Sequence, residues 1–513
     1  MKSVSIFLIF ILLFSSCTQF PRNKAHPEVS SQSIQRGMQL ASVYCSSCHQ
    51  LPDPSLLDAK SWEEGVLPHM GPRLGIYEFK YKRYPANLND PDLPKGFYPS
   101  HASITPDEWQ HIINYYTATS PDLLPSQQRT TPIHSTLPLF AAQAPGITEP
   151  SPGISAVCIH AAAHEFMTAD LLRQNLVRYN NKLEVIDSLH LFGRLVDIQL
   201  LPDNLLTCNI GVFSPTNDKW GKLQLVATNE AGKMQPQDKP LLENLQRPVH
   251  VSLTDLNGDG KPDYLVCEFG YLTGSLSWYG QEEAGWKKHV LRAEPGAVKT
   301  VVEDYNHDGL PDIWALFAQG NEGVFLYTNK GKGEFEQQQV LRFPPSYGSS
   351  HFELADFNGD GFPDIVYTCG DNADYSTVLK PYHGVYIFLN DGTNHFTQRY
   401  FFPINGCYKA MARDFDGDGD LDLACIAFFA DYKRQPQEGF VYLENTGGFR
   451  FEPYTILQAA TGRWMTMDAG DVDGDGDQDI LLGNFSVGPQ MMKPAVDPEK
   501  GPPFLLLRNT TKP

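Results

Sequence analysis

One nine-residue pattern recurs five times in the second half of the chain, and it limits the possible folds more than any other feature. The copies begin at Asp255, Asp304, Asp356, Asp414 and Asp471, so successive starts lie 49, 52, 58 and 57 residues apart. A period of this length is typical of a solenoid or a β-propeller, in which each copy marks one repeated unit. The 513 residues provide enough chain for one such large domain and a smaller one.

Side-chain oxygens stand at positions 1, 3, 5 and 9 of every copy, and glycine stands at position 6. This is the spacing of the first part of an EF-hand calcium loop. The remainder differs, because position 12 falls in apolar, strand-like runs such as 264–267, where an EF-hand has a glutamate and then a helix. We therefore expect calcium loops that connect β-strands. The expected ligands are Asp255, Asn257, Asp259, Asp263, Asp304, Asn306, Asp308, Asp312, Asp356, Asn358, Asp360, Asp364, Asp414, Asp416, Asp418, Asp422, Asp471, Asp473, Asp475 and Asp479.

The alternative is that these segments are ordinary hairpin turns, since Asp, Asn and Gly are favoured in turns without any metal. All five copies keep the side-chain oxygens, however, even where His307 replaces the glycine of position 4. The loops together contain 19 acidic residues in a chain whose net charge is −20. Carboxylates packed this closely repel one another unless cations neutralise them, so we expect about five bound calcium ions.

A second strand and a turn follow each loop, as in residues 323–331 and 384–392. This unit resembles the FG-GAP or VCBS repeat, and the resemblance implies a mainly β fold, a seven-bladed β-propeller with calcium-binding loops over residues 150–513. Seven blades fit the length, because the 364 residues from 150 to 513 give 52 per blade, within the observed spacing. Residues 154–180 and 196–203 look like parts of two upstream blades without calcium ligands.

The sequence Cys45-Ser46-Ser47-Cys48-His49 is a C-x-x-C-H motif, the arrangement that attaches haem covalently. Two thiols at this spacing reach the two vinyl groups of one porphyrin, and the adjacent histidine then lies under the iron. A zinc site would need a second close pair of ligands, and a thioredoxin-like pair would need a βαβ context. Neither is visible, so we expect one haem c on Cys45 and Cys48, with His49 as an iron ligand.

The flanks of this motif predict a small all-α domain over residues 30–125. Residues 35–44 are expected to form a helix that enters the motif, and Thr105 and Pro106 are expected to begin another as its cap and first turn. The stretch resembles a small class I cytochrome c, which implies an electron-transfer domain. Met70 and His69 compete as the sixth iron ligand; we favour Met70, because proline and glycine bracket it as a stiff ligand loop requires.

The N-terminus reads as an export signal. An apolar run over residues 5–14 follows Met1-Lys2 and leads to Ser15-Ser16-Cys17, which resembles a bacterial lipobox. We expect residues 1–17 to be a signal peptide and Cys17 to carry a lipid. The lipid would anchor the exported protein in the bacterial cell envelope, in the periplasm or at the outer membrane. The alternative is an ordinary leader that is cleaved off together with Cys17. Prolines between the two domains predict an extended linker over residues 126–149. The six cysteines beyond residue 150 are scattered, which predicts buried apolar residues.

The net charge of −20 repels nucleic acid and anionic lipid, so we expect no nucleic-acid partner and membrane contact only through the lipid anchor. The favoured interpretation is an exported monohaem electron-transfer protein with a redox partner protein, whose propeller binds another protein or a glycan. One alternative makes the propeller a haem-coupled dehydrogenase or carbohydrate-active enzyme; His160, His164 and Glu165 are its most suggestive cluster, but they lack a zincin spacing. The other alternative is an adhesion or binding module. We favour a carrier or binding protein over an enzyme.

Overall fold

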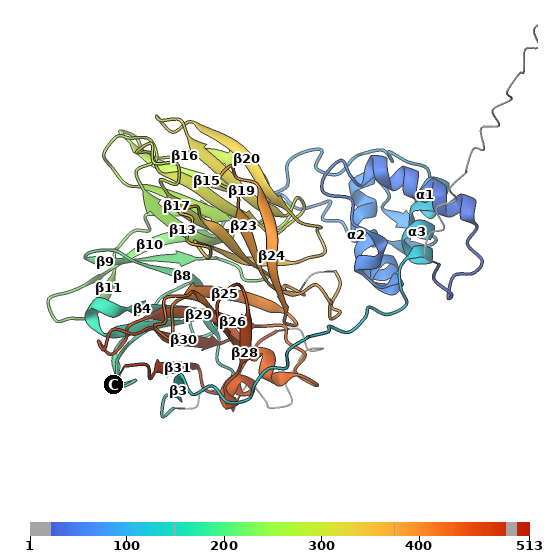
Figure 1. Ribbon diagram of the computed structural model, residues 1–513. Coiled ribbons are helices and arrows are strands. Elements are labelled where there is room, and N and C mark those ends of the chain that lie inside the picture. Colours follow the sequence, from blue (N-terminus) through green and yellow to red (C-terminus); the bar gives the residue numbers. More distant parts are fainter. Residues whose placement is uncertain (1–21, 148–149, 374, 489–499, 513) are drawn as a thin grey trace, which may run out of the picture.

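The computed structural model describes residues 22–147, 150–373, 375–488 and 500–512. The expected signal peptide and Cys17 lie outside these residues. The chain forms a helical domain beside a large propeller (Figure 1). Within the described ranges, no helix is long and apolar enough to cross a membrane.

The helical domain is built on two long helices that pack against each other, α1 (Ser31–Tyr44) and α3 (Pro106–Thr119). The Ser30 side chain caps α1, and Thr105 and Glu108 form a reciprocal capping box at α3, which confirms the predicted start of this helix. The helices cross closely at Gly37, where a Cβ atom would lie 1.9 Å from the carbonyl oxygen of His111. Shorter elements lie between them: the 3₁₀ turn Pro54–Leu56, the π-helix Ser61–Val66, α2 (Leu67–Met70), the 3₁₀ turn Gly71–Leu74, and the hairpin of β1 (Glu78–Phe79) and β2 (Lys82–Arg83).

Within the described residues, seven antiparallel sheets form the blades of the propeller, as the sequence predicts. Their core is apolar on both faces of each sheet, which is why the second strands read as continuous hydrophobic runs. The blades are β4 (Ile154–His160), β5 (Glu165–Asp170), β6 (Asn175–Asn180) and β7 (Val185–His190); β8 (Leu195–Leu200), β9 (Asn204–Asn209), β10 (Gly221–Thr228), β11 (Met234–Pro236) and β12 (Leu242–Leu245); β13 (Pro248–Thr254), β14 (Asp263–Glu268), β15 (Ser275–Glu282) and β16 (Gly285–Arg292); β17 (Ala297–Glu303), β18 (Asp312–Phe317), β19 (Gly323–Asn329) and β20 (Phe335–Arg342); β21 (Ser349–Ala355), β22 (Asp364–Cys369), β23 (Gly384–Asn390) and β24 (Phe396–Pro403); β25 (Cys407–Arg413), β26 (Asp422–Ala427), β27 (Phe440–Asn445) and β28 (Phe451–Tyr454); and β29 (Trp464–Gly470), β30 (Asp479–Asn484), β31 (Phe504–Asn509) and β3 (Phe140–Gln143). We number these blades 1 to 7 in this order.

The outer strand of blade 7 comes from the N-terminal side of the propeller. Strand β3 pairs with β31, from Phe140 opposite Asn509 to Gln143 opposite Leu506, and so closes the ring. This strand lies inside the segment 126–149 that the sequence predicts as a linker, so the propeller begins at Phe140 rather than at residue 150. Its four residues are too few for a readable strand pattern, and its partner is far away in the sequence.

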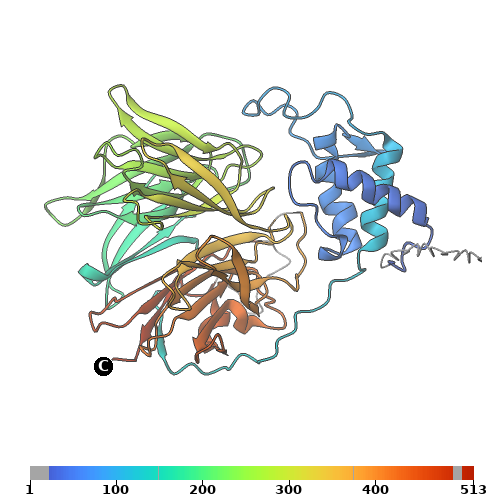
Figure 2. The ribbon, with the colours of Figure 1, turned by 45° about the horizontal axis from the view of Figure 1, so that its top comes forward.

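The linker does not run free in solution. The Gln127 side chain donates a hydrogen bond of 2.7 Å to the carbonyl oxygen of His383, and Arg129 forms an ion pair with buried Glu438. The helical domain itself touches the propeller, because Tyr382 Oη donates to the Leu56 carbonyl oxygen at 3.0 Å. Figure 2 shows the helical domain at the side of the propeller and the linker passing along it. The two domains are therefore in contact, which an extended tether would not predict.

The first strand of every blade, which we call the inner strand, has the same irregularity. In blade 4, for example, Ala297 pairs with Phe317, and the register shifts before the next pair, Lys299 with Leu316. Equivalent shifts occur in the inner strands of the other six blades. Each inner strand contacts the inner strand of the next blade, and the last contacts the first, so the seven strands surround the propeller axis.

Candidate metal-binding loops and the helical domain

The five acidic loops occupy equivalent places in blades 3 to 7. Each connects an inner strand to the second strand of its blade, so all five lie at the same end of the propeller. The position 9 aspartate is the first residue of that second strand in each of these five blades, and its side chain is fully buried. These residues are Asp263, Asp312, Asp364, Asp422 and Asp479.

The position 1 aspartate organises each loop by accepting backbone hydrogen bonds. In the first loop, Asp255 Oδ1 accepts from Gly258 N at 2.7 Å and Oδ2 accepts from Gly260 N at 2.8 Å. The bond to the position 6 glycine recurs in the other four loops. These glycines have φ between 81° and 98°, a left-handed conformation that other residues adopt only with strain. The loops are therefore folded into one shape by their own side chains.

Carboxylates of positions 1, 3 and 9 converge in the last two loops. In blade 6, oxygen atoms of Asp414, Asp416 and Asp422 all lie within 4.8 Å of one another. Asp471, Asp473 and Asp479 form the same group in blade 7. The first three loops have asparagine at position 3, so there the corresponding group would combine two carboxylates with an amide oxygen. The position 5 carboxylate lies outside the two convergent groups of acids. It accepts a hydrogen bond from the backbone N–H of position 7 instead; Asp418, for example, accepts from Asp420 N at 2.9 Å.

The buried position 9 carboxylates lack full compensation from the protein. Burial, together with repulsion from the nearby Asp416 and Asp473, raises the pKa values of Asp422 and Asp479 to about 6. In the first two loops, Oδ1 of Asp263 and Oδ2 of Asp312 are buried and have no hydrogen-bond partner among the described residues. Hard oxygen donors with unsatisfied charge are the ligand set that calcium takes, so these residues fit the ion.

The loop of blade 7 contains a feature that the sequence motif does not reveal. Arg508, from β31, places Nη1 2.5 Å from Asp473 Oδ2 and 3.8 Å from Asp479 Oδ2. A guanidinium thus neutralises part of the charge of this one carboxylate group. Only the pairing of β30 with β31 brings the arginine here, and no local pattern could have predicted it.

The C-x-x-C-H residues follow the end of α1 in the helical domain. Cys45 is half-buried, Cys48 is exposed, and both are free thiols. Burial raises the pKa of Cys45 to about 11, whereas a redox-active or zinc-binding cysteine needs a lowered pKa. His49 Nδ1 forms a hydrogen bond of 2.8 Å with the Gln50 carbonyl oxygen, and its Nε2 has no hydrogen bond to a described residue. His49 therefore has the tautomer and orientation of a histidine that offers Nε2 to a metal.

The two candidates for a sixth iron ligand face different surroundings. Met70 ends α2 and packs against the core of the helical domain, together with Tyr44 and Cys45. His69 donates from Nδ1 to the Gly65 carbonyl oxygen at 2.7 Å, and its ring stacks on Tyr375 of the propeller at 3.9 Å. Met70 thus shares a core with the C-x-x-C-H motif, and His69 faces the domain contact. Met70 is helical, not in the loop that the sequence predicts.

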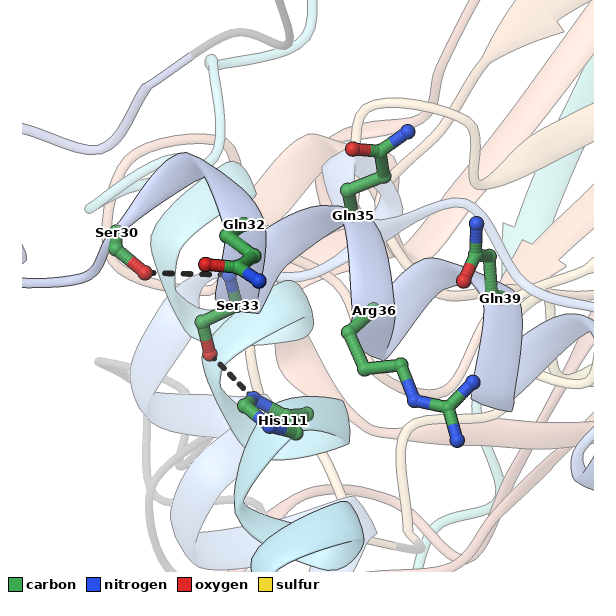
Figure 3. A pocket seen from close by; sticks show the side chains of 7 residues that line it. All are labelled: Ser30, Gln32, Ser33, Gln35, Arg36, Gln39 and His111. Carbon is green, nitrogen blue, oxygen red and sulfur yellow. Dashed lines mark hydrogen bonds between the residues drawn. The ribbon is translucent and has the colours of Figure 1, made fainter.

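The remaining features are a hollow on α1, the residues around His160 and the cysteines of the propeller. A shallow polar hollow on α1 contains the bond between Ser33 Oγ and His111 Nδ1, 2.7 Å long, that joins α1 to α3 (Figure 3). His164 has a left-handed backbone, and Oε2 of Glu165 lies 3.7 Å from Nε of Arg178. Among the described residues, the groups of three or more potential metal ligands are the two aspartate groups above, so the suggested cluster around His160 is not assembled. The six propeller cysteines are buried and unpaired, which confirms their predicted role.

Comparison with known proteins supports the interpretation of the propeller. The family described as FG-GAP-like repeat matches residues 274–367 and 414–482. The chain contains FG-GAP-like repeats. It is similar to integrin alpha pat-2 of Caenorhabditis briggsae, with 26% identity over 216 residues that make up 37% of this chain and 18% of that protein. It is also similar to a T-cell immunomodulatory protein homolog of Plasmodium falciparum, with 30% identity over 141 residues, 25% of this chain and 19% of that protein.

Each of these matches covers less than a fifth of the relative's own length. Among solved structures, virginiamycin B lyase from Staphylococcus aureus covers 72% of this chain and 99% of its own, with a TM-score of 0.44 and 11% identity. The residues matched by the family model lie within the propeller.

Proposed function

We propose that the propeller is a binding or adhesion module whose five acidic loops hold calcium. The FG-GAP-like repeats and the similarity to an integrin alpha chain support this alternative better than electron transfer alone. The observation that carries the proposal is the repetition of one self-organised oxygen site in five consecutive blades, all at one end of the ring. Calcium would neutralise this acidic end, and a protein or glycan partner would bind the rigid propeller.

The first test is calcium titration of the full chain by isothermal calorimetry. We expect about five sites, with affinities in the range of extracellular calcium modules. The Asp414→Asn variant should lose one site, because this carboxylate organises its loop and is an expected ligand. Asp420→Asn is the matched control, since Asp420 is an exposed acid of the same loop outside the ligand positions. Equal binding by both variants would contradict the proposed sites.

The second test concerns the partner. Immobilised full chain is exposed to a glycan array and to envelope proteins of the producing cells, in calcium and after chelation. We expect binding that depends on calcium and that weakens in the Asp414→Asn variant but not in the Asp420→Asn variant. Binding that survives complete chelation would separate the partner site from the loops and contradict this part of the proposal.

We further propose that the helical domain carries one haem c and exchanges electrons with a redox partner protein. The specific support is the free Nε2 of His49 directly after two free thiols, with Met70 in the same core. A haem bound here would supply one-electron chemistry. Cys45 and Cys48 would hold it covalently, while Gln50 fixes the orientation of the His49 ring. Met70 is the proposed sixth ligand, because His69 is engaged by Tyr375 and Gly65.

Covalent attachment is tested by haem staining of denatured protein produced together with a cytochrome c maturation system. We expect stain that survives denaturation and organic extraction, and its loss in the double variant Cys45→Ala/Cys48→Ala. Ser46→Ala is the matched control, because this residue lies in the motif but forms no thioether. Haem that is extracted by acidified solvent would refute the attachment. We also propose export and lipidation at Cys17, which radiolabelled palmitate and a Cys17→Ala variant would test.

A further inference from the structure

The residue that follows the register shift in each inner strand defines a ring around the propeller axis. This axial ring consists of Ala156, Asp197, His250, Lys299, His351, Lys409 and Thr466. Five of its seven members are ionisable. This is unexpected at the centre of a propeller, because charged side chains are costly to bury unless they are paired. Contacts across blade boundaries connect the members, because His250 Nδ1 lies 3.0 Å from Asp197 Oδ2 and Lys299 Nζ lies 2.8 Å from His351 Nε2.

The carboxylates in this region already have partners. Asp197 accepts from the His250 ring and from Val251 N at 3.1 Å. Glu353 accepts from Arg413 Nη1 at 3.0 Å and from Ala412 N at 3.1 Å. Asp468 accepts from Ile159 N at 2.8 Å. Each of these acids connects its own blade to the next one, so the acids serve to join the ring.

The lysines are different, because neither has a carboxylate within ion-pair distance among the described residues. Lys299 has the bond to His351 Nε2, and Lys409 Nζ donates to the Met467 carbonyl oxygen at 2.7 Å. Each ammonium group has three donors, so both retain unused N–H groups. The two lysines lie close enough to influence each other electrostatically, together with Arg413. Both lysines of the ring can therefore still donate hydrogen bonds to a further acceptor.

His351 contributes a further donor. An ammonium group can only donate, so His351 Nε2 accepts from Lys299, and the neutral ring then carries its hydrogen on Nδ1. This Nδ1 is buried and has no hydrogen-bond partner among the described residues, and the whole residue is only 7% exposed. An unpaired buried donor is costly and therefore points to an acceptor that the protein itself does not supply.

The charges that face this pair agree with that interpretation. Burial lowers the pKa of Lys299 to about 8. Lys409 and Arg413 also lower this pKa, whereas Glu353 and Asp197 raise it. Burial lowers the pKa of His351 well below its ordinary value, and Lys299, Lys409, His250 and Arg413 lower it further. A bound anion would relieve both groups.

We propose that the axial ring binds a small oxyanion, a carboxylate or a phosphate-type group, which accepts hydrogen bonds from Lys299, His351 Nδ1 and Lys409. The site is distinct from the calcium loops and from the helical domain, and it depends on neither proposal above. Its donors come from three consecutive blades, 4, 5 and 6, so only the closed ring brings them together.

The test uses the full chain in calcium-containing buffer at constant ionic strength, with sodium chloride replaced stepwise by sodium sulfate or by sodium acetate. Thermal unfolding is followed by circular dichroism. We expect the melting temperature to rise and saturate with at least one of the two anions. In the Lys299→Met variant the half-saturating concentration should increase about tenfold or more, since a charge-assisted bond is lost. Lys287→Met is the matched control, because Lys287 is an exposed lysine of β16 that pairs with Glu282.

The outcomes separate the sources of the anion. Saturation by sulfate alone assigns a phosphate-type ligand, and saturation by acetate alone assigns a carboxylate. Sulfate also stabilises proteins by exclusion from their surface, an effect that does not saturate and that all three proteins share. In chloride, Lys299→Met should melt no lower than the parent chain, because it removes an uncompensated buried cation. If it does not fold, Lys409→Met provides the same comparison. No saturable response in the parent chain, or an equal response in the lysine variant, overturns the proposal.

Discussion

Removing calcium should change the sign of the pH dependence of the propeller's stability. Asp422 and Asp479 are buried at the inner end of their loops, and without a cation their pKa values are raised from 3.8 to about 6. A raised pKa means that the folded state binds the proton more tightly than the unfolded chain does. Stability from these groups is therefore present below pH 4 and is lost as the pH rises through 6.

The magnitude follows from the shift. A difference of about two pH units at 1.36 kcal/mol per unit corresponds to ~3 kcal/mol for each group, and partial solvent screening reduces it to about 1–3 kcal/mol. The calcium-free protein should thus gain about 2–6 kcal/mol from these two residues between pH 7 and pH 4, which is several degrees in melting temperature for a domain of this size. With calcium bound, the cation favours the ionised carboxylates, and protons compete with it, so stability should instead fall as the pH falls.

The assay is scanning calorimetry of the full chain at pH 7, 6, 5 and 4, after passage over a chelating resin and after addition of calcium. Asp416→Asn is the informative variant, because it gives the blade 6 loop the asparagine found at position 3 of the first three loops. We expect it to reduce the calcium-dependent gain in melting temperature while the calcium-free protein still becomes more stable on acidification. Identical pH profiles with and without calcium would refute the reasoning.

Three further predictions concern other contacts. Arg508→Gln should raise the calcium affinity of the blade 7 loop about tenfold, because the guanidinium that forms a charge-assisted bond with Asp473 no longer competes with the ion. Calorimetric titration measures the affinity, and unchanged or weaker binding would contradict the prediction. Gly37→Leu should destabilise the helical domain by about 3 kcal/mol or more, since its Cβ alone would meet the His111 carbonyl at 1.9 Å. Helical circular dichroism on heating checks it, and Gln39→Leu, at an exposed position of the same helix, is the control. In haem-loaded protein, Met70→Ala should lower the reduction potential and open the iron to added ligands, whereas an unchanged potential would move the sixth ligand to another residue.

The repeats could be predicted from the sequence because their information is local. Oxygen side chains at fixed positions, a glycine with positive φ and a following apolar strand lie within about fifteen consecutive residues, and each unit is repeated. The capping box of Thr105 and Glu108 is equally local, and so the start of α3 was predictable. In both cases, the residues that determine the structure are neighbours in the chain.

The features that the sequence could not predict all depend on pairing between distant segments. Strand β3 has four residues and a partner more than 360 residues away, and Arg508 reaches the blade 7 loop only through the neighbouring strand. The docking of Tyr382 and Tyr375 on the helical domain depends on a loop whose sequence shows no periodicity. The axial ring is the same kind of case, because its members are about fifty residues apart and only ring closure makes them neighbours.

The closing strand β3 also determines how the molecule would bear a mechanical load. A pull on the N-terminal segment passes through the helical domain and the linker, loads their contacts with the propeller, and then reaches β3 and its backbone bonds to β31. The pair is antiparallel, with Phe140 opposite Asn509, so a load between the two chain ends acts at one end of the pair and opens its bonds one after another. The point at which the ring is sealed is thus also where mechanical separation would begin, and loss of β3 there would open blade 7, whose loop Arg508 of β31 helps to hold.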